Sequence, residues 1–287
     1  MSPSAEHAVT APTRLSLPWL SQLNTYCVME PAVGLAWQEV FAAASGTVAT
    51  PAHRAVVFLG LWLGYSADRW LDARSVLRPF PEQGLTDRHR FFAKYRRGLA
   101  KLWLVVFLCN ALIAVTFLTP LELISGMLVL VATAAYLTIV QKRSTVRWLK
   151  SPLAALVFVA GTSVFAWSYQ WNVELLAAQL TLTLLAIFNL KATSYAEQGV
   201  DLLSTTTQPE TTEDTPLRLG LTILFASLCL LLPALGASSW SLVGLAAASA
   251  LLCSALIARV AQRYVDPSTT HSLLDLVLFL PTLSLAI

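Results

Sequence analysis

The feature that most constrains this chain is a succession of long apolar runs separated by polar connections. A run of about 20 apolar residues crosses the hydrocarbon core of a bilayer as a helix. Because a backbone in lipid must satisfy its own hydrogen bonds, such runs form helices, and their continuous apolarity excludes the alternating strands of an outer-membrane barrel. With 56% hydrophobic and 12% charged residues, the chain differs from disordered chains and from ordinary soluble enzymes. The expected fold class is an all-α, polytopic membrane protein.

Nine transmembrane spans are predicted, at residues 24–45, 54–72, 98–118, 121–140, 152–170, 173–196, 217–236, 239–260 and 271–287. The first span contains Glu30, Gln38 and Glu39, and polar groups at membrane depth favour a helix that faces a cavity. Residues 1–17 are polar and are expected to form a disordered N-terminal tail. Residues 18–287 are expected to form a single transmembrane domain.

The distribution of basic residues predicts the topology. All of the 19 Lys and Arg residues except Arg54 lie in, or border, the tail and the loops after the second, fourth, sixth and eighth spans. The positive-inside rule therefore places the N-terminus in the cytoplasm and the C-terminus outside. The two long loops, 73–97 and 197–216, are then cytoplasmic. We expect a multi-pass protein, located in the inner membrane if the source is bacterial, with its site facing the cytoplasm.

Two pairs of acidic residues lie where the second and sixth predicted helices end. Asp68 and Asp72 form the first pair, and Glu197 and Asp201 form the second. The i, i+4 spacing puts both carboxylates of a pair on one helix face, where they repel each other and oppose the helix dipole. A hard cation such as Mg²⁺ relieves both effects, and two facing pairs would hold a diphosphate between metal ions. The alternative is that these are solvated charges at helix ends.

Basic residues near the acidic pairs supply the other half of a phosphate site. The candidates for binding phosphate oxygens are Arg69, Arg78, Lys142, Arg143 and Lys191. Each of them is also explained as a positive-inside anchor. The four histidines are scattered along the sequence, and no histidine metal site is predicted. His271 and Asp275 are interpreted as a helical pair or as an anchor for Arg259 or Arg263, without a chemical role.

These motifs together resemble the UbiA superfamily of intramembrane prenyltransferases, which has nine transmembrane helices and acidic motifs at the cytoplasmic ends of helices 2 and 6. The matching positions are Asp68, Arg69, Asp72, Arg78-Pro79, Tyr136, Lys142-Arg143, Glu197 and Asp201. The family's leading Asn falls at Gly64, and the leading acid of its second motif falls at Thr193. The chain therefore looks like a divergent member.

The resemblance implies a Mg²⁺-dependent transfer of an isoprenyl group from its diphosphate to an aromatic or other lipophilic acceptor. The metal ligands and catalytic residues would be Asp68, Asp72, Glu197 and Asp201, with the basic residues above on the diphosphate. The substrate pocket would include Tyr65, Tyr195, Asn24 and Glu30. The expected partners are donor, acceptor and lipid bilayer, with no nucleic acid or protein.

Two alternatives remain open. A terpene cyclase of the same superfamily would use identical acidic pairs. A non-catalytic, lipid-binding membrane scaffold is favoured by the absence of a ligand side chain at Gly64.

Overall fold

The chain was studied as a computed structural model that describes residues 15, 17–76, 87–142, 149–204, 247, 249–250, 252–254, 256–257, 265 and 267–283. These residues form helices and their connections, with a single isolated bridge between Leu15 and Val265. The part of the chain that the structure describes contains no strand, which confirms the all-α class. The predicted tail, apart from residues 15 and 17, and the seventh span lie outside the described residues.

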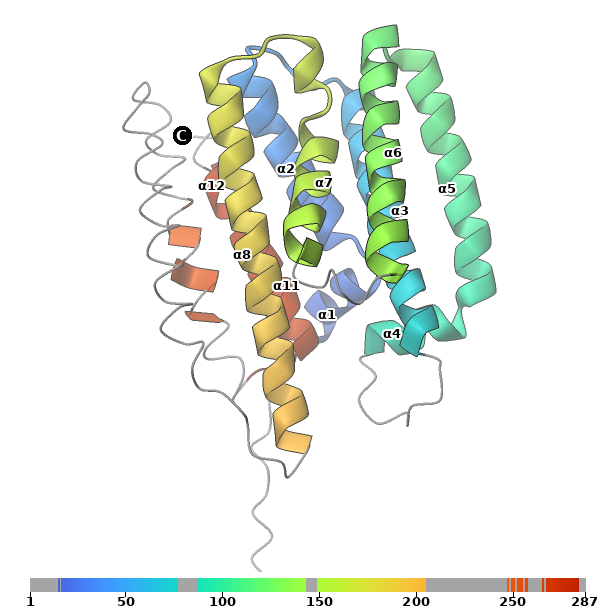
Figure 1. Cartoon of the computed structure of the whole chain (residues 1–287), viewed down its shortest axis with the longest axis vertical. Coiled ribbons are helices and arrows are strands. Elements are labelled where there is room, and N and C mark those ends of the chain that lie inside the picture. The colour runs from blue at the N-terminus through green and yellow to red at the C-terminus, as the bar shows by residue number, and fades with distance from the viewer. Residues whose placement is uncertain are drawn as a thin grey trace, which may run out of the picture.

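The helices run up and down in a bundle (Figure 1). In chain order they are α1 (Pro18–Thr25), α2 (Met29–Ala44), α3 (Pro51–Val76), α4 (Asp87–Lys94), α5 (Arg96–Phe117), α6 (Pro120–Lys142), α7 (Lys150–Ser163), the 3-10 turn η2 (Ala166–Ser168), α8 (Val173–Ser204), α11 (Pro267–Val277) and α12 (Leu280–Leu283). We call the end where α3, α6 and α8 begin the upper end, and the opposite end the lower end. The predicted acidic pairs thus belong to two helices that finish at the lower end (Figure 1).

Several boundaries differ from the predicted spans. The first span is two helices, because the chain turns at residues 26–28, where Cys27 adopts a left-handed φ of 55°. The predicted loop 73–97 contains helix α4 and the end of α3, and α8 continues to Ser204, so Glu197 and Asp201 lie within a helix. An apolar run predicts only the part of a helix that crosses lipid. The helix itself continues into the flanking polar sequence wherever those residues also favour a helix.

Three described helical segments are long and apolar enough to cross a membrane: Arg96–Phe117, Pro120–Ile139 and Val173–Thr193. The first two form the α5–α6 hairpin, and none of the residues of α5 is buried. Large apolar side chains such as Leu112, Val115 and Leu128 are instead exposed along this hairpin. An apolar surface of this extent is unfavourable in water, so the structure supports a membrane protein.

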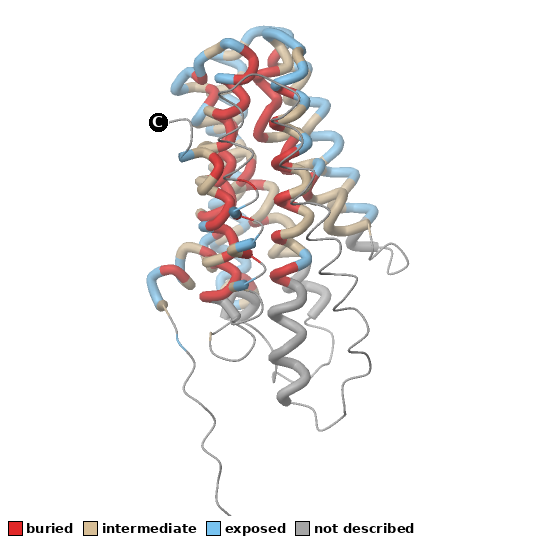
Figure 2. Tube along the Cα trace, turned by 90° about the vertical axis from the view of Figure 1, so that its left-hand side faces the viewer, coloured by how far each residue is buried: buried red, intermediate tan, exposed pale blue. Residues whose placement is uncertain are grey.

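Helix α2 occupies the centre of the packed core. Its side chains Val33, Trp37, Val40 and Phe41 are buried, and α2 contacts α3, α7, α8 and α11. Figure 2 shows buried segments running along several neighbouring helices rather than clustering at one end. The Trp37 Nε1–H donates to the carbonyl oxygen of Leu278 at 2.9 Å. This bond ties α2 to the turn after α11, and so fixes α11 against the core.

A buried histidine–carboxylate contact joins two helices at the upper end. His53 Nε2 lies 3.0 Å from Glu122 Oε1, and both side chains are almost fully buried. The other Glu122 oxygen accepts from the Thr119 N–H and hydroxyl, each at 2.8 Å, in a capping-box arrangement. His53 Nδ1 accepts from the Thr50 N–H at 3.3 Å. The starts of α3 and α6 are therefore joined by a pair whose polar atoms have hydrogen-bond partners.

Candidate functional site

A cavity of about 760 Å³ lies between helices α3, α5, α6 and α7. Most of its lining is apolar or aromatic, including Leu61, Tyr65, Phe107, Leu123 and Phe158. Tyr65 packs edge-on against Phe158, with ring centroids 6.1 Å apart. A concave, mainly apolar space of this size is typical of a site for a small lipophilic molecule.

Polar groups gather toward the lower end of this cavity. The lining residues contributed by the lower parts of the helices include Asp68, Arg69, Tyr136, Lys150, Thr193 and His271. They come from α3, α6, α7, α8 and α11, so five helices converge there. The cavity therefore combines a mainly apolar wall with one carboxylate and two cations near its lower end, while Glu122 at its upper end is already paired with His53.

The cavity also meets the apolar surface of the α5–α6 hairpin. Val115, Met127 and Leu130 line the cavity and are at the same time exposed, by 72%, 58% and 47%. In a bilayer this surface faces lipid chains rather than water. The cavity is thus bordered by side chains that contact the membrane interior.

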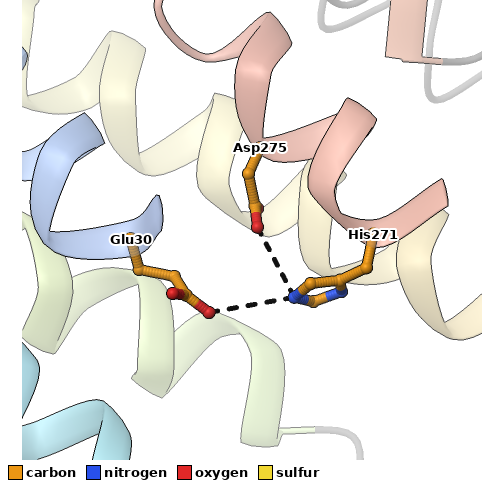
Figure 3. A group of neighbouring side chains, drawn as sticks. All are labelled: Glu30, His271 and Asp275. Carbon is orange, nitrogen blue, oxygen red and sulfur yellow. Dashed lines mark ion pairs between the residues drawn. The ribbon is translucent and has the colours of Figure 1, made fainter. Parts of the chain in front are cut away.

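A second group of polar side chains lies beside the lower part of the cavity (Figure 3). It consists of Glu30 from α2 and of His271 and Asp275 from α11, all three buried. His271 Nε2 lies 3.5 Å from Asp275 Oδ2 and 3.9 Å from Glu30 Oε1. One ring nitrogen therefore faces two carboxylates, as Figure 3 shows. We call these three residues the Glu–His–Asp cluster.

Neighbouring residues hold the cluster in place. The Asn189 amide donates to Asp275 Oδ1 at 2.9 Å, which links α8 to α11. Arg69 places a guanidinium nitrogen 3.9 Å from Glu30 Oε1. Glu30 lies in the first turn of α2, where the helix dipole favours a carboxylate. Because Arg69 and His271 also line the cavity, the cluster and the cavity are parts of one region.

The structure brings some of the predicted site residues to this region. Asp68, Arg69 and Tyr65 line the cavity, and Glu30 contacts two residues that line it. Asn24 is buried in α1 but does not line the cavity, and Lys191 is exposed on α8. Lys191 is exposed because the helical period directs its neighbours Leu190 and Thr193, and not Lys191, toward the cavity.

The other predicted residues are only partly described. Arg78 and Arg143 lie outside the described residues. Asp72, Lys142, Tyr195, Glu197 and Asp201 have helical backbones, and their side chains lie outside the description. By backbone, Asp72 is one turn beyond Asp68 in α3, and the second acidic pair is in the last part of α8.

Sequence reasoning missed two residues of this region. The sequence assigns His271 no chemical role, and Lys150 is not among its candidates, although both residues line the cavity. The interpretation of His271 and Asp275 as a helical pair is confirmed by their 3.5 Å contact. Glu30 lies close to them in space but more than 200 positions away in the sequence, and local periodicity does not reveal such a contact. The available signal was the presence of three ionisable groups in apolar spans.

Comparisons with known proteins add no family assignment. The chain matches no family model, and neither the curated proteins nor the solved structures contain a match.

Proposed function

We propose that this protein is an intramembrane prenyltransferase, which moves an isoprenyl group from an isoprenyl diphosphate to an aromatic or other lipophilic acceptor. The observation that carries the proposal is the cavity of about 760 Å³, which is mainly apolar and has Asp68, Arg69 and Lys150 toward one end. An isoprenyl diphosphate has the same division into a long apolar chain and a charged head. The UbiA-like motifs in the sequence point to the same class of substrate.

The cavity residues suit the reaction. Arg69 and Lys150 would bind diphosphate oxygens and stabilise the negative charge that develops when the allylic C–O bond breaks and its electron pair leaves with diphosphate. The face of the Tyr65 ring would stabilise the allylic cation. The acceptor carbon then forms the new C–C bond, and the acceptor loses a proton. The apolar walls exclude water, which would otherwise capture the cation.

The residues proposed to hold Mg²⁺ are Asp68, Asp72, Glu197 and Asp201. All four offer carboxylate oxygens, the ligands that Mg²⁺ prefers, and all belong to the lower parts of α3 and α8. Bound Mg²⁺ would neutralise diphosphate charge and so favour its departure.

The proposed topology has nine membrane crossings with the N-terminus and the lower end in the cytoplasm. Its support is the gathering of basic residues toward that end. Arg54 and its partner Glu39, 2.7 Å apart, lie near the upper ends of α3 and α2. A multi-pass protein of the inner membrane, if the source is bacterial, fits this arrangement.

The test is release of diphosphate by the purified full-length chain in detergent, with Mg²⁺ and a panel of isoprenyl diphosphates, with and without aromatic acceptors. We expect Asp68→Asn to lower the rate about 100-fold or more, because it removes charge at the reacting head group. The matched control is Glu39→Gln, which removes one exposed carboxylate at the other end of the bundle and is expected to keep the wild-type rate.

The outcomes separate the alternatives. Acceptor-dependent release with a coupled product supports the transferase, and release with a cyclised hydrocarbon from donor alone indicates a cyclase. If folded wild-type protein releases no more diphosphate than Asp68→Asn, the proposal fails and a lipid-binding scaffold replaces it.

A further inference from the structure

We infer that the Glu–His–Asp cluster is a binding site for one divalent transition-metal ion of the Mn²⁺, Fe²⁺ and Zn²⁺ group, distinct from the proposed Mg²⁺ carboxylates. Glu30, His271 and Asp275 each offer one donor atom, and the three donor atoms lie within 4.8 Å of one another. The site goes beyond the proposed prenyl transfer and does not depend on it.

The first argument is geometric. Metal bonds of about 2.0–2.2 Å place the donors of one ion roughly 3.0–3.6 Å apart. The two separations, 3.5 Å from His271 to Asp275 and 3.9 Å from His271 to Glu30, are close to this range. They are too long for hydrogen bonds, and a single ring N–H cannot serve two carboxylates at once. The three donors converge on a point between them (Figure 3).

Most polar atoms of the cluster have no hydrogen-bond partner among the described residues. Among the residues that the structure describes, neither carboxylate oxygen of Glu30, neither ring nitrogen of His271, nor Asp275 Oδ2 has a hydrogen bond. All three side chains are at most 6% exposed. Buried polar atoms without partners are rare in folded proteins and call for an explanation such as a bound ion. Five such atoms in one cluster fit a ligand that bonds to several of them together.

The third argument is charge. Two carboxylates face one guanidinium, that of Arg69, so these three side chains together carry a negative formal charge. A buried negative charge is unfavourable, and a divalent cation compensates it. Asn189 donates to the outer oxygen of Asp275, as residues behind metal ligands commonly do.

The ligand set selects the class of metal. Two carboxylates and one imidazole form a mixed oxygen and nitrogen set, which suits Mn²⁺, Fe²⁺ or Zn²⁺ better than Mg²⁺. Because His271 lines the cavity, the ion has a route to the cluster and lies at the edge of the substrate space.

The experiment measures metal in the full-length protein, purified in detergent with excess Mg²⁺ present to fill carboxylate-only sites. Samples are loaded separately with Mn²⁺, Fe²⁺ and Zn²⁺, desalted and analysed by mass spectrometry of the elements. We expect about one retained ion per chain for at least one of these metals. Loading with Co²⁺ should give the visible absorption of a nitrogen-ligated ion.

The variants test the assignment. His271→Gln and Asp275→Asn should lower retention at least tenfold and remove the Co²⁺ absorption. The matched control is His53→Gln, which changes the other histidine buried beside a carboxylate and should keep the metal. Retention unchanged in His271→Gln overturns the assignment.

Wild-type protein alone also decides the question, so the proposal does not depend on the folding of a variant. Retention below a tenth of an ion per chain for all three metals, in protein with a cooperative unfolding transition, overturns it. The cluster is then a structural contact between α2 and α11. Diphosphate release is measured in the same samples, so failure of this site is distinguishable from failure of the proposed transferase.

Discussion

The described part of the molecule contains two buried groups that pair a histidine with carboxylates, one near each end of the bundle. At the upper end, His53 contacts Glu122 at 3.0 Å, and threonine groups complete the hydrogen bonding of both. In the Glu–His–Asp cluster the contacts are 3.5 and 3.9 Å, and most of the polar atoms have no hydrogen bond among the described residues. Both groups combine a histidine with carboxylates, but they differ in how many of their polar atoms have hydrogen-bond partners.

This difference separates a structural role from a ligand-binding one. A fully hydrogen-bonded buried pair joins two helices and has no capacity left for a further ligand. An incompletely bonded group in an equally buried place is unfavourable by itself, and a ligand makes it favourable. The two groups therefore predict opposite responses to mutation and to metal.

The largest effect is expected at the upper end. Glu122→Ala should lower the free energy of unfolding by about 3–5 kcal/mol, because it leaves His53 and the start of α6 without their buried partner. Thermal or denaturant unfolding in detergent measures this change. The control is Glu39→Ala, whose carboxylate is exposed. Equal losses in the two variants would show that the upper pair has no special structural role.

Metal should have the next largest effect, confined to the cluster. At a metal concentration of about one hundred times Kd, the unfolding free energy of the wild type should rise by about 2.7 kcal/mol. The same metal should leave Asp275→Asn unchanged, because one of the three donors is lost. Unfolding curves with and without metal measure both. A similar rise in Asp275→Asn would place the ion elsewhere.

Without metal, mutation of the cluster should have a smaller effect than mutation of the upper pair. Glu30→Gln removes one of two neighbouring carboxylates and the 3.9 Å ion contact with Arg69, but it breaks no hydrogen bond among the described residues. We expect a change of about 1 kcal/mol or less, the size of one ordinary hydrogen bond. The measurement is unfolding in the presence of a chelator. A loss comparable to that of Glu122→Ala would remove the contrast between the groups.

The smallest effect is expected for the exposed ion pair. Arg54 and Glu39 contact at 2.7 Å, but both side chains are more than 40% exposed. Arg54→Ala should change the unfolding free energy by about 0.5 kcal/mol or less, since solvent screens such pairs. Unfolding at low and high salt measures the change. A strong salt dependence would show that geometry rather than burial controls these contacts.

The sequence predicted the helical class because apolar runs of membrane length have one backbone solution. It did not predict the division of the first span at Cys27 or the helix α4, because both depend on tertiary contacts at polar positions. Trp62, for example, donates to the carbonyl oxygen of Tyr26 at 3.0 Å and so ties the α1–α2 turn to α3. Such a contact has no signature in local periodicity.

In the candidate site, the sequence predicted the residues that belong to a local motif but not those brought together by long-range contacts. Asp68 and Arg69 were found from their spacing, and both line the cavity. Glu30 was singled out as a carboxylate in an apolar span, but its neighbours His271 and Asp275 come from the other end of the chain. Only the packing of α11 against α2 brings them together. A single sequence contains no measure of that packing.

The exposed, cavity-lining side chains of the α5–α6 hairpin have a consequence for kinetics. Val115, Met127 and Leu130 line the cavity and are exposed on the apolar surface, so a lipophilic substrate of the proposed reaction would enter from the bilayer. The relevant concentration is then the mole fraction of that molecule in the membrane, not its amount per volume of buffer. Diluting a fixed amount of substrate with inert lipid should slow uptake, while diluting the vesicles with buffer should leave it unchanged.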